Sequence, residues 1–196
     1  MQETDLSWLD SAQKGDPDAF TQLVEAFQQP VFNLCYRMLG DAAEAEDAAQ
    51  ETFMRVYRSI KRYDNSRPFP TWLMSIAAHY CIDQQRRRRI PLVEMDDFLA
   101  EIIADPAPDP ERSLARSQED DKLHQLLNTL NPQDRAAVVL RYWHDYSDEE
   151  IANSLSLSVS AVKSRLHRAR LALAKRWNND DDVPVAERNQ YVSRII

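Results

Sequence analysis

The stretch from Tyr146 to Leu173 constrains the fold of this chain more than any other part of the sequence. It reads YSDEEIANSLSLSVSAVKSRLHRARLAL, which is two short helical patterns separated by three residues. Ser147 and Glu150 form a capping box, and this pair predicts where the first helix begins. The break SLS supplies the turn, and its last serine is suited to cap the second helix. We therefore expect two helices joined by a tight turn.

The second of these helices has two chemically different faces. Its apolar residues recur at three- and four-residue steps, and this spacing places them on one buried stripe. The stripe consists of Val159, Val162, Leu166, Ala169 and Leu173. The opposite face carries Ser160, Lys163, Ser164, His167 and Arg168, with Arg165 and Arg170 at its margins. An ordinary amphipathic surface helix would show a similar pattern, but the cap, the turn and the lack of acids together favour a DNA-reading helix-turn-helix.

The segment EEIANSLSLSVSAVKSRLHRARLAL resembles region 4 of the sigma factors, the promoter-recognition subunits of bacterial RNA polymerase. The resemblance implies that the seven polar residues of the second helix contact the −35 promoter element. Lys163 and Arg168 are expected to read base edges, and Arg165 and Arg170 to contact phosphates. Two positions depart from the family pattern: Ser156 replaces a glycine in the turn, and Ala161 replaces a threonine. If φ is positive at the turn, a serine there is strained.

Composition indicates a helical protein without an enzymatic signature. The chain has 196 residues, 43% of them hydrophobic and only 2 glycines, which disfavours a turn-rich β fold. It contains no apolar run long enough to span a membrane and no apolar signal segment at its N-terminus. Cys35 and Cys81 lie in apolar helical patterns, as expected for reduced, buried thiols of a cytoplasmic protein. Because no metal-ligand spacing, phosphate loop or nucleophile constellation occurs, we expect no metal, cofactor or catalytic residue.

Charge is distributed in blocks along the chain. The net charge is −8, yet residues 55–89 hold nine Lys and Arg against two acids, and residues 163–176 hold six bases and no acid. Between these blocks, residues 91–121 hold ten acids against two arginines. Non-specific DNA binding depends mainly on counterion release, which an acidic chain disfavours. The distribution therefore indicates a protein that binds DNA as part of a larger assembly.

The N-terminal half shows further helical patterns. We expect helices over 5–14 and from Asp16 to Gly40, with a kink or an interruption at Pro30. A helix over 42–60, capped by Asp41, has one polar face. This face consists of Asp47, Gln50, Glu51 and Met54. Acids also suit the first half of any helix because of its dipole, so the face alone does not indicate a binding site.

A loop and a basic helix follow. Residues 61–70, KRYDNSRPFP, combine aromatic and cationic side chains, a mixture that suits stacking on unpaired bases. The alternative for Tyr63 and Phe69 is that either ring belongs to the core. The pattern over 71–89 predicts a helix that ends in four arginines, where the charge favours both the helix dipole and phosphate.

The segments DAAQETFMRVYRSI and FPTWLMSIAAHYCIDQQRRRR resemble region 2 of sigma factors, specifically of the extracytoplasmic-function group. The resemblance implies that the face formed by Asp47, Gln50, Glu51 and Met54 docks on the β′ clamp coiled coil of core polymerase. It also implies that the β flap is a second polymerase contact. It also implies that the loop and the next helix capture the unwound −10 strand. The residues concerned are Arg62, Tyr63, Arg67, Phe69, Trp72, His79, Arg86 and Arg87. His79 stands where the family usually has asparagine.

We therefore predict an all-α protein with two small helical domains. The expected division is region 2 over 1–90, an acidic proline-containing linker over 91–112, region 4 over 113–177 and a tail over 178–196. The resemblance implies a non-catalytic, cytoplasmic sigma factor whose partners are core polymerase, promoter DNA and an anti-sigma factor, with a role in stress response. It also directs the linker toward the polymerase cleft, where its acids are suited to mimic phosphate. The alternative is a stand-alone helix-turn-helix regulator with an N-terminal sensing domain; an enzyme has the least support.

Overall fold

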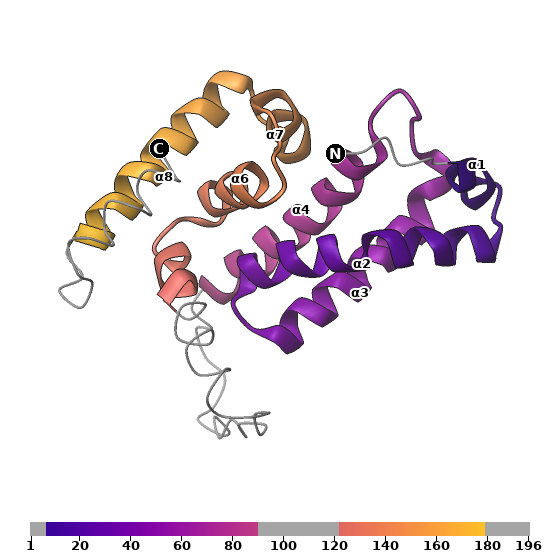
Figure 1. Ribbon diagram of the computed structural model, residues 1–196, viewed down its shortest axis with the longest axis horizontal. Helices are drawn as coiled ribbons and strands as arrows, with labels where there is room; N and C mark the ends of the chain where they lie inside the picture. The colour runs from indigo at the N-terminus through magenta and orange to yellow at the C-terminus, as the bar shows by residue number, and fades with distance from the viewer. Residues whose placement is uncertain (1–6, 90–121, 179–196) are drawn as a thin grey trace.

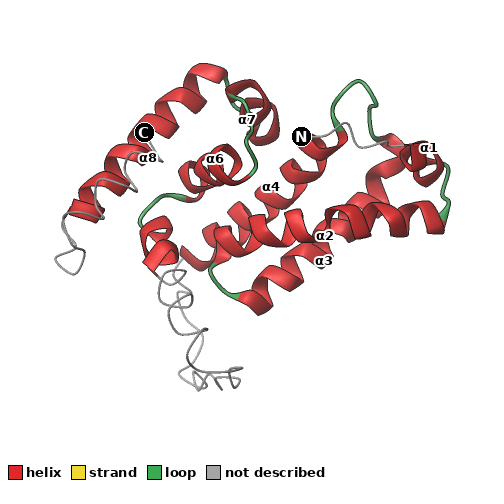
Figure 2. Ribbon diagram, in the orientation of Figure 1, coloured by secondary structure: helices red, strands yellow, loops and turns green. Residues whose placement is uncertain are grey.

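The computed structural model describes residues 7–89 and 122–178, and within these ranges every regular element is a helix (Figures 1 and 2). The first group contains α1 (Ser7–Gln13), α2 (Pro17–Leu39), α3 (Ala42–Ser59), the 3-10 turn η1 (Ile60–Arg62) and α4 (Phe69–Arg89). The second contains a helical turn over 122–128, α6 (Pro132–Trp143), α7 (Asp148–Leu155) and α8 (Val159–Asn178). The all-α prediction is confirmed. The predicted linker over 91–112 and the tail beyond residue 178 lie outside the described residues.

Local capping sets the helix boundaries that the sequence predicted. The Asp16 carboxylate accepts a hydrogen bond of 2.9 Å from the Asp18 amide, and Asp41 does the same for Glu44 at 2.9 Å. Gly40 ends α2 with a φ of 83°, a backbone conformation in which glycine has no Cβ to clash. At α6, the Asn131 side chain accepts from the amide of Asp134 at 2.9 Å. Each of these caps satisfies an amide that would otherwise lack a partner.

Of the two outcomes predicted at Pro30, a kink or an interruption, the interruption is wrong, because α2 runs through this proline without a break. An interior proline removes one backbone hydrogen bond and costs roughly 3 kcal/mol. Burial of apolar side chains on both sides of Pro30 offsets this cost, since Phe27, Val31 and Leu34 all lie in the core. Tertiary packing has therefore overridden the local preference.

Helix α4 lies at the centre of the molecule (Figure 1). It packs against α2 and α3 of the first group and against α6 and α7 of the second, whereas α8 packs on α6 and α7 at the outer edge. Leu73, Ala77 and Cys81 of α4 are completely buried. The buried apolar residues of both groups form one continuous core.

Polar contacts at the end of α2 join the two groups. Arg135 of α6 is only 4% exposed, and its Nη1 donates to the carbonyl of Met38 at 2.6 Å. The Gln85 side chain donates to the same carbonyl. Carbonyls in the last turn of a helix lack intrahelical partners and carry the negative end of the dipole, so a cation is stabilised there. Nearby, the ring of His124 meets that of Tyr36 edge-on, with 4.5 Å between the ring centroids.

Candidate nucleic-acid interface

The helix-turn-helix has the predicted caps. The Ser147 amide donates to the Glu150 carboxylate at 2.8 Å, and the Glu150 amide donates to the Ser147 hydroxyl at 3.2 Å, which completes the capping box. The turn follows at Ser156, whose φ of 54° and ψ of 46° lie in the left-handed region. The condition for strain at this serine, a positive φ, is therefore met. Ser158 caps α8 by accepting from the Ala161 amide at 3.2 Å.

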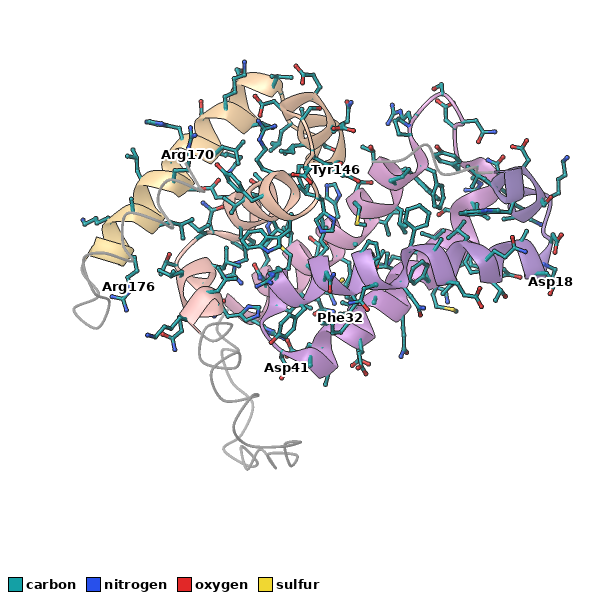
Figure 3. The ribbon with its side chains drawn as sticks, in the orientation of Figure 1. Asp18, Phe32, Asp41, Tyr146, Arg170 and Arg176 are labelled. Atoms are coloured by element: carbon teal, nitrogen blue, oxygen red, sulfur yellow. The ribbon has the colours of Figure 1, made fainter. Side chains whose placement is uncertain are left out.

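Helix α8 presents the predicted polar face to solvent. Val162, Leu166 and Ala169 are buried against the rest of the second group. The exposed residues of the opposite face are Ser160, Lys163, Ser164, His167 and Arg168, while Arg170 is half-buried (Figure 3). The Ser164 hydroxyl donates to the Ser160 carbonyl at 2.9 Å, so its oxygen remains an acceptor. This face can donate from Lys, His and Arg and accept through serine oxygens.

Arg165 does not lie where the sequence predicted. Its side chain turns toward α6, where Nη1 lies 2.7 Å from a carboxylate oxygen of Asp134 and Nη2 lies 2.6 Å from the amide oxygen of Gln133. The side chain is 21% exposed. The prediction of a phosphate contact is corrected, because both terminal nitrogens of this guanidinium are already bonded to α6.

Two aromatic residues predicted to stack on −10 bases are core residues. Phe69 is 1% exposed and Tyr63 is also buried. The ring of Phe69 lies 5.5 Å from Phe27, 5.5 Å from Tyr63 and 5.7 Å from Trp72, measured between centroids. The Tyr63 hydroxyl donates to the Arg67 carbonyl and so closes the loop on itself. This burial favours the core alternative for Phe69 and Tyr63, since a base can reach these rings only if the core opens. Trp72 is half-buried.

Hydrogen bonds to Gln13 of α1 hold the loop between η1 and α4 in shape. The Gln13 side chain of α1 donates to the carbonyls of Ile60 at 3.3 Å and Tyr63 at 3.0 Å, and Asn65 donates to Gln13 at 3.2 Å. Hydrogen bonds from the Ser66 amide and hydroxyl lower the pKa of Asp64, which keeps this carboxylate ionised. Gln13 was not predicted from the sequence, because nothing local indicates a contact with residues about fifty positions away.

Cationic side chains surround this loop and follow α4. Arg62, Arg67, His79, Arg86 and Arg87 are all exposed. The His79 Nδ1 lies 2.7 Å from the Ser75 carbonyl, and because a carbonyl only accepts, Nδ1 carries the proton. In neutral His79 the Nε2 atom is therefore an acceptor. Arg88 differs from its neighbours because it pairs with Glu44 of α3, and this bond raises the pKa of the guanidinium.

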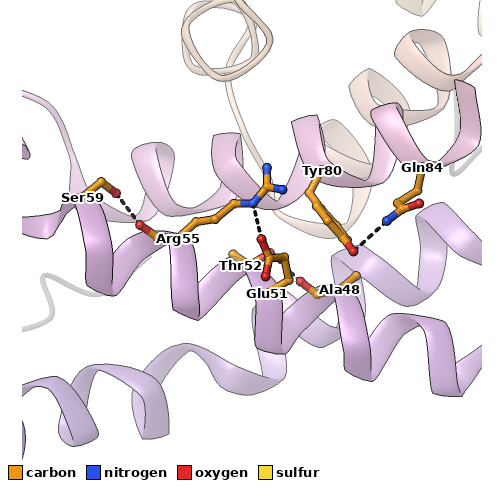
Figure 4. Close-up of polar contacts among 7 residues, drawn as sticks. All are labelled: Ala48, Glu51, Thr52, Arg55, Ser59, Tyr80 and Gln84. Carbon is orange, nitrogen blue, oxygen red and sulfur yellow. Dashed lines mark hydrogen bonds and ion pairs between the residues drawn. The ribbon is translucent and has the colours of Figure 1, made fainter. Parts of the chain in front are cut away.

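The polar face of α3 is open to solvent. Asp47 and Gln50 are exposed, and Met54 is 49% exposed. Glu51 is half-buried and accepts a 2.8 Å bond from Arg55. The Arg55 guanidinium in turn lies 4.8 Å from the centre of the Tyr80 ring, which connects α3 to α4 (Figure 4). The four predicted residues thus occupy one helix face. Glu51 is the one of the four that forms an ion pair with Arg55.

Tyr57 extends this face and was not predicted from the sequence. It is 56% exposed, and its ring meets that of Phe20 edge-on at 5.0 Å between centroids. It lies three residues after Met54, so the helical spacing that identified the other members also applied to it.

Other chemistries have little support in the described residues. Cys35 and Cys81 are buried and unlinked, and their mutual hydrogen bond together with burial raises the pKa of the Cys81 thiol, so it stays protonated and unreactive. Over residues 7–89 and 122–178, no cluster of His, Cys, Asp or Glu is large enough to hold a metal ion. The same residues include no helix that could span a membrane.

Comparison with known proteins identifies the family. Residues 23–90 match Sigma-70 region 2, and residues 120–173 match Sigma-70, region 4. ECF RNA polymerase sigma factor SigW of Bacillus subtilis is 36% identical over 176 residues, covering 85% of this chain and 93% of SigW. RNA polymerase sigma-H factor of Pseudomonas aeruginosa is 33% identical, covering 89% of this chain and 94% of that protein.

A solved structure shows the same fold. CnrH, in complex with the cytosolic domain of CnrY, superimposes with a TM-score of 0.70 at 25% identity, covering 90% of this chain and 99% of CnrH. All of these comparisons indicate the same family, and the two relatives and the solved structure each cover most of the chain. The chain belongs to the sigma-70 family of RNA polymerase sigma factors, in the extracytoplasmic-function group.

Proposed function

We propose that this sigma factor recognises promoters through three exposed surfaces, one for each of its functions. The family role is to direct core RNA polymerase to promoters and to initiate transcription there. The assignment of that role to particular residues rests mainly on one observation. Helix α8 buries an apolar stripe and leaves a continuous cationic, hydrogen-bonding face exposed.

The first surface is the exposed face of α8, which reads the −35 element. Lys163 and Arg168 project opposite the buried stripe and are suited to pair with guanine edges in the major groove. Ser160, Ser164 and His167 supply further donors and acceptors, and Arg170 contacts phosphate at the groove wall. The capping box and the tight turn at Ser156 fix where this helix begins.

The second surface surrounds the loop before α4 and captures the −10 strand. Arg62 and Arg67 hold the backbone of the unwound strand, and Arg86 and Arg87 extend this basic surface along α4. His79 supplies an exposed ring with a defined acceptor. Trp72 is the half-buried aromatic of the loop cluster, and this makes it the base-stacking residue.

The third surface is the α3 face, which docks on the β′ clamp coiled coil. Asp47 and Gln50 offer hydrogen-bonding groups to solvent, and Met54 and Tyr57 add exposed apolar area beside them. An apolar centre with a polar rim is the usual composition of a protein interface. The β flap of core polymerase is the second polymerase contact in this proposal.

Regulation involves a protein partner, and we assign no catalytic residue to this chain. CnrH was solved with the cytosolic domain of CnrY, and an anti-sigma factor of equivalent role would restrain this chain. The alternative of a stand-alone regulator has less support, because relatives named as sigma factors match both halves of the chain.

Addition of core polymerase tests the proposed function. Purified chain alone should leave a promoter fragment unshifted in a gel, and chain with core polymerase should give a sequence-specific complex that initiates transcription. Asp47→Lys should remove the complex while keeping the helical circular dichroism, and Asp18→Lys, an exposed acid of α2, is the matched control. A specific shift by the chain alone would instead favour the stand-alone regulator.

A further inference from the structure

The guanidinium of Arg165 forms two bonds that cross from α8 to the first turn of α6. Nη1 bonds to the Asp134 carboxylate at 2.7 Å, and Nη2 bonds to the Gln133 amide oxygen at 2.6 Å. Two bonds from one planar group to two neighbouring residues restrict its orientation more than a single bond does. Arg165 therefore relates the position of α8 directly to that of α6.

Asp134 is itself held in place on three sides. Its side chain is 8% exposed, and its second carboxylate oxygen accepts from the Asn131 side chain at 2.6 Å. The Asp134 amide donates to the oxygen of the same asparagine side chain at 2.9 Å. The residue also lies in the first turn of α6, where the helix dipole favours a negative charge. The Arg165 guanidinium therefore binds to a carboxylate that has little freedom to move.

We propose that the bond between Asp134 and Arg165 is a positioning contact that sets the orientation of the recognition helix for −35 reading. The proposal rests on the proposed function of α8. Apolar packing through Val162 and Leu166 is not directional, so it allows a helix to rotate or slide by small amounts. A partly buried, charged bond fixes the rotation. Lys163 lies two residues before Arg165 and Arg168 lies three residues after it. A rotation of α8 about its axis at Arg165 therefore moves both side chains.

A direct phosphate contact by Arg165 predicts different behaviour. Removal of a phosphate contact reduces the magnitude of the negative slope of log K against log salt by about 0.9. It also weakens binding to all DNA sequences alike. In that case Asp134→Ala would release Arg165 toward DNA and would not reduce binding. A positioning contact predicts that removing either partner relaxes base preference and leaves the salt slope unchanged. A bond that only stabilises the fold would lower the amount of active protein without changing base preference.

Holoenzyme reconstituted from core polymerase and the full chain separates these possibilities. Transcription from a library of −35 sequences gives base preference, and binding at several salt concentrations gives the slope. Arg165→Ala and Asp134→Ala should each reduce the preference for the best −35 base by about tenfold, and the double variant should be no worse than either single variant. Arg170→Ala serves as the phosphate-contact control and should lower the slope with preference unchanged.

Several results would overturn the proposal. Unchanged base preference in both single variants would show that the bond does not position α8. A smaller salt slope in Arg165→Ala, together with parent-like binding and base preference in Asp134→Ala, would show that Arg165 contacts phosphate instead. If the alanine variants unfold, Arg165→Lys and Asp134→Asn take their place, and unfolding of these conservative variants as well would assign the bond to stability alone. Failure of the proposed function is recognised separately: Lys163→Ala and Arg168→Ala would then also leave −35 preference unchanged.

Discussion

Replacing Phe69 by alanine distinguishes a core residue from a base-stacking residue. Phe69 is 1% exposed, and its ring is surrounded by those of Phe27, Tyr63 and Trp72. Truncation of a buried phenylalanine to alanine costs about 3–5 kcal/mol, since apolar transfer energy is lost and a cavity remains. A domain of this size has a free energy of unfolding of roughly 5–15 kcal/mol. We therefore expect Phe69→Ala to remove a large part of the stability of the fold.

Matched variants give this prediction its precision. Phe69→Leu retains most of the buried volume and should cost less than about 1.5 kcal/mol. Tyr63→Phe removes the hydroxyl that donates to the Arg67 carbonyl and should cost about 1 kcal/mol. Arg67→Ala removes an exposed cation, so it should change the free energy of unfolding by less than about 0.5 kcal/mol while impairing promoter opening.

Two measurements test these values together. Urea denaturation followed by circular dichroism gives the free energy of unfolding of each variant, and permanganate footprinting of the holoenzyme on a promoter gives the extent of −10 opening. The core assignment predicts that opening by Phe69→Leu stays close to that of the parent protein. The reasoning would be refuted if Phe69→Ala kept the parent stability within about 0.5 kcal/mol and lost promoter opening, since this combination is expected for a stacking residue worth ~1–3 kcal/mol per base.

Three further predictions concern other parts of the molecule. Asp47→Lys should weaken the binding of core polymerase in a pull-down without lowering the melting temperature, because this carboxylate is exposed; retained affinity would contradict the docking face. Ser156→Gly should raise the free energy of unfolding by about 1 kcal/mol in thermal denaturation, since glycine adopts positive φ without strain, whereas a lower melting temperature would argue against strain. Burial raises the pKa of Tyr146 above its ordinary value near 10, so its contribution to stability is present below about pH 10 and is lost as the pH rises further. Tyr146→Phe should flatten this alkaline loss in denaturation experiments above pH 10, and an unchanged pH profile would show that Tyr146 is not its source.

Helix boundaries were predictable because they depend on contacts between residues close in sequence. The Ser147 capping box, the Asp41 cap and the Asn131 cap each involve a side chain and an amide within three residues. The same holds for the faces of α3 and α8, since helical periodicity alone assigns their buried and exposed sides. The sequence did not decide the sign of φ at Ser156, which the structure shows to be positive.

Residues at the margin of a helix face were not predictable in this way. Arg165 lies beside the buried stripe of α8, so its side chain could extend into solvent or toward a neighbouring helix, and only the position of Asp134 decides between them. Phe69 and Tyr63 occur in a proline-rich, polar segment whose composition indicates a loop. Their burial depends on Phe27 and on α1, about forty and fifty residues earlier in the chain. Sequence periodicity carries no information about such distant neighbours.

The first turn of α6 connects the recognition helix to the first group of helices through two adjacent residues. Asp134 binds Arg165 of α8, and Arg135 binds the Met38 carbonyl at the end of α2. Successive side chains of a helix diverge by about 100°, so neighbouring residues can bond in two different directions. The two bonds differ in what happens if the groups separate. The Met38 carbonyl and the Arg135 guanidinium can each bond to water instead, because separation exposes both. The Asp134–Arg165 bond lies entirely within the second group and survives the separation. If the two groups separated, α6 and α8 would therefore stay joined through this bond, and Arg165 would keep its place beside Lys163 and Arg168 on α8.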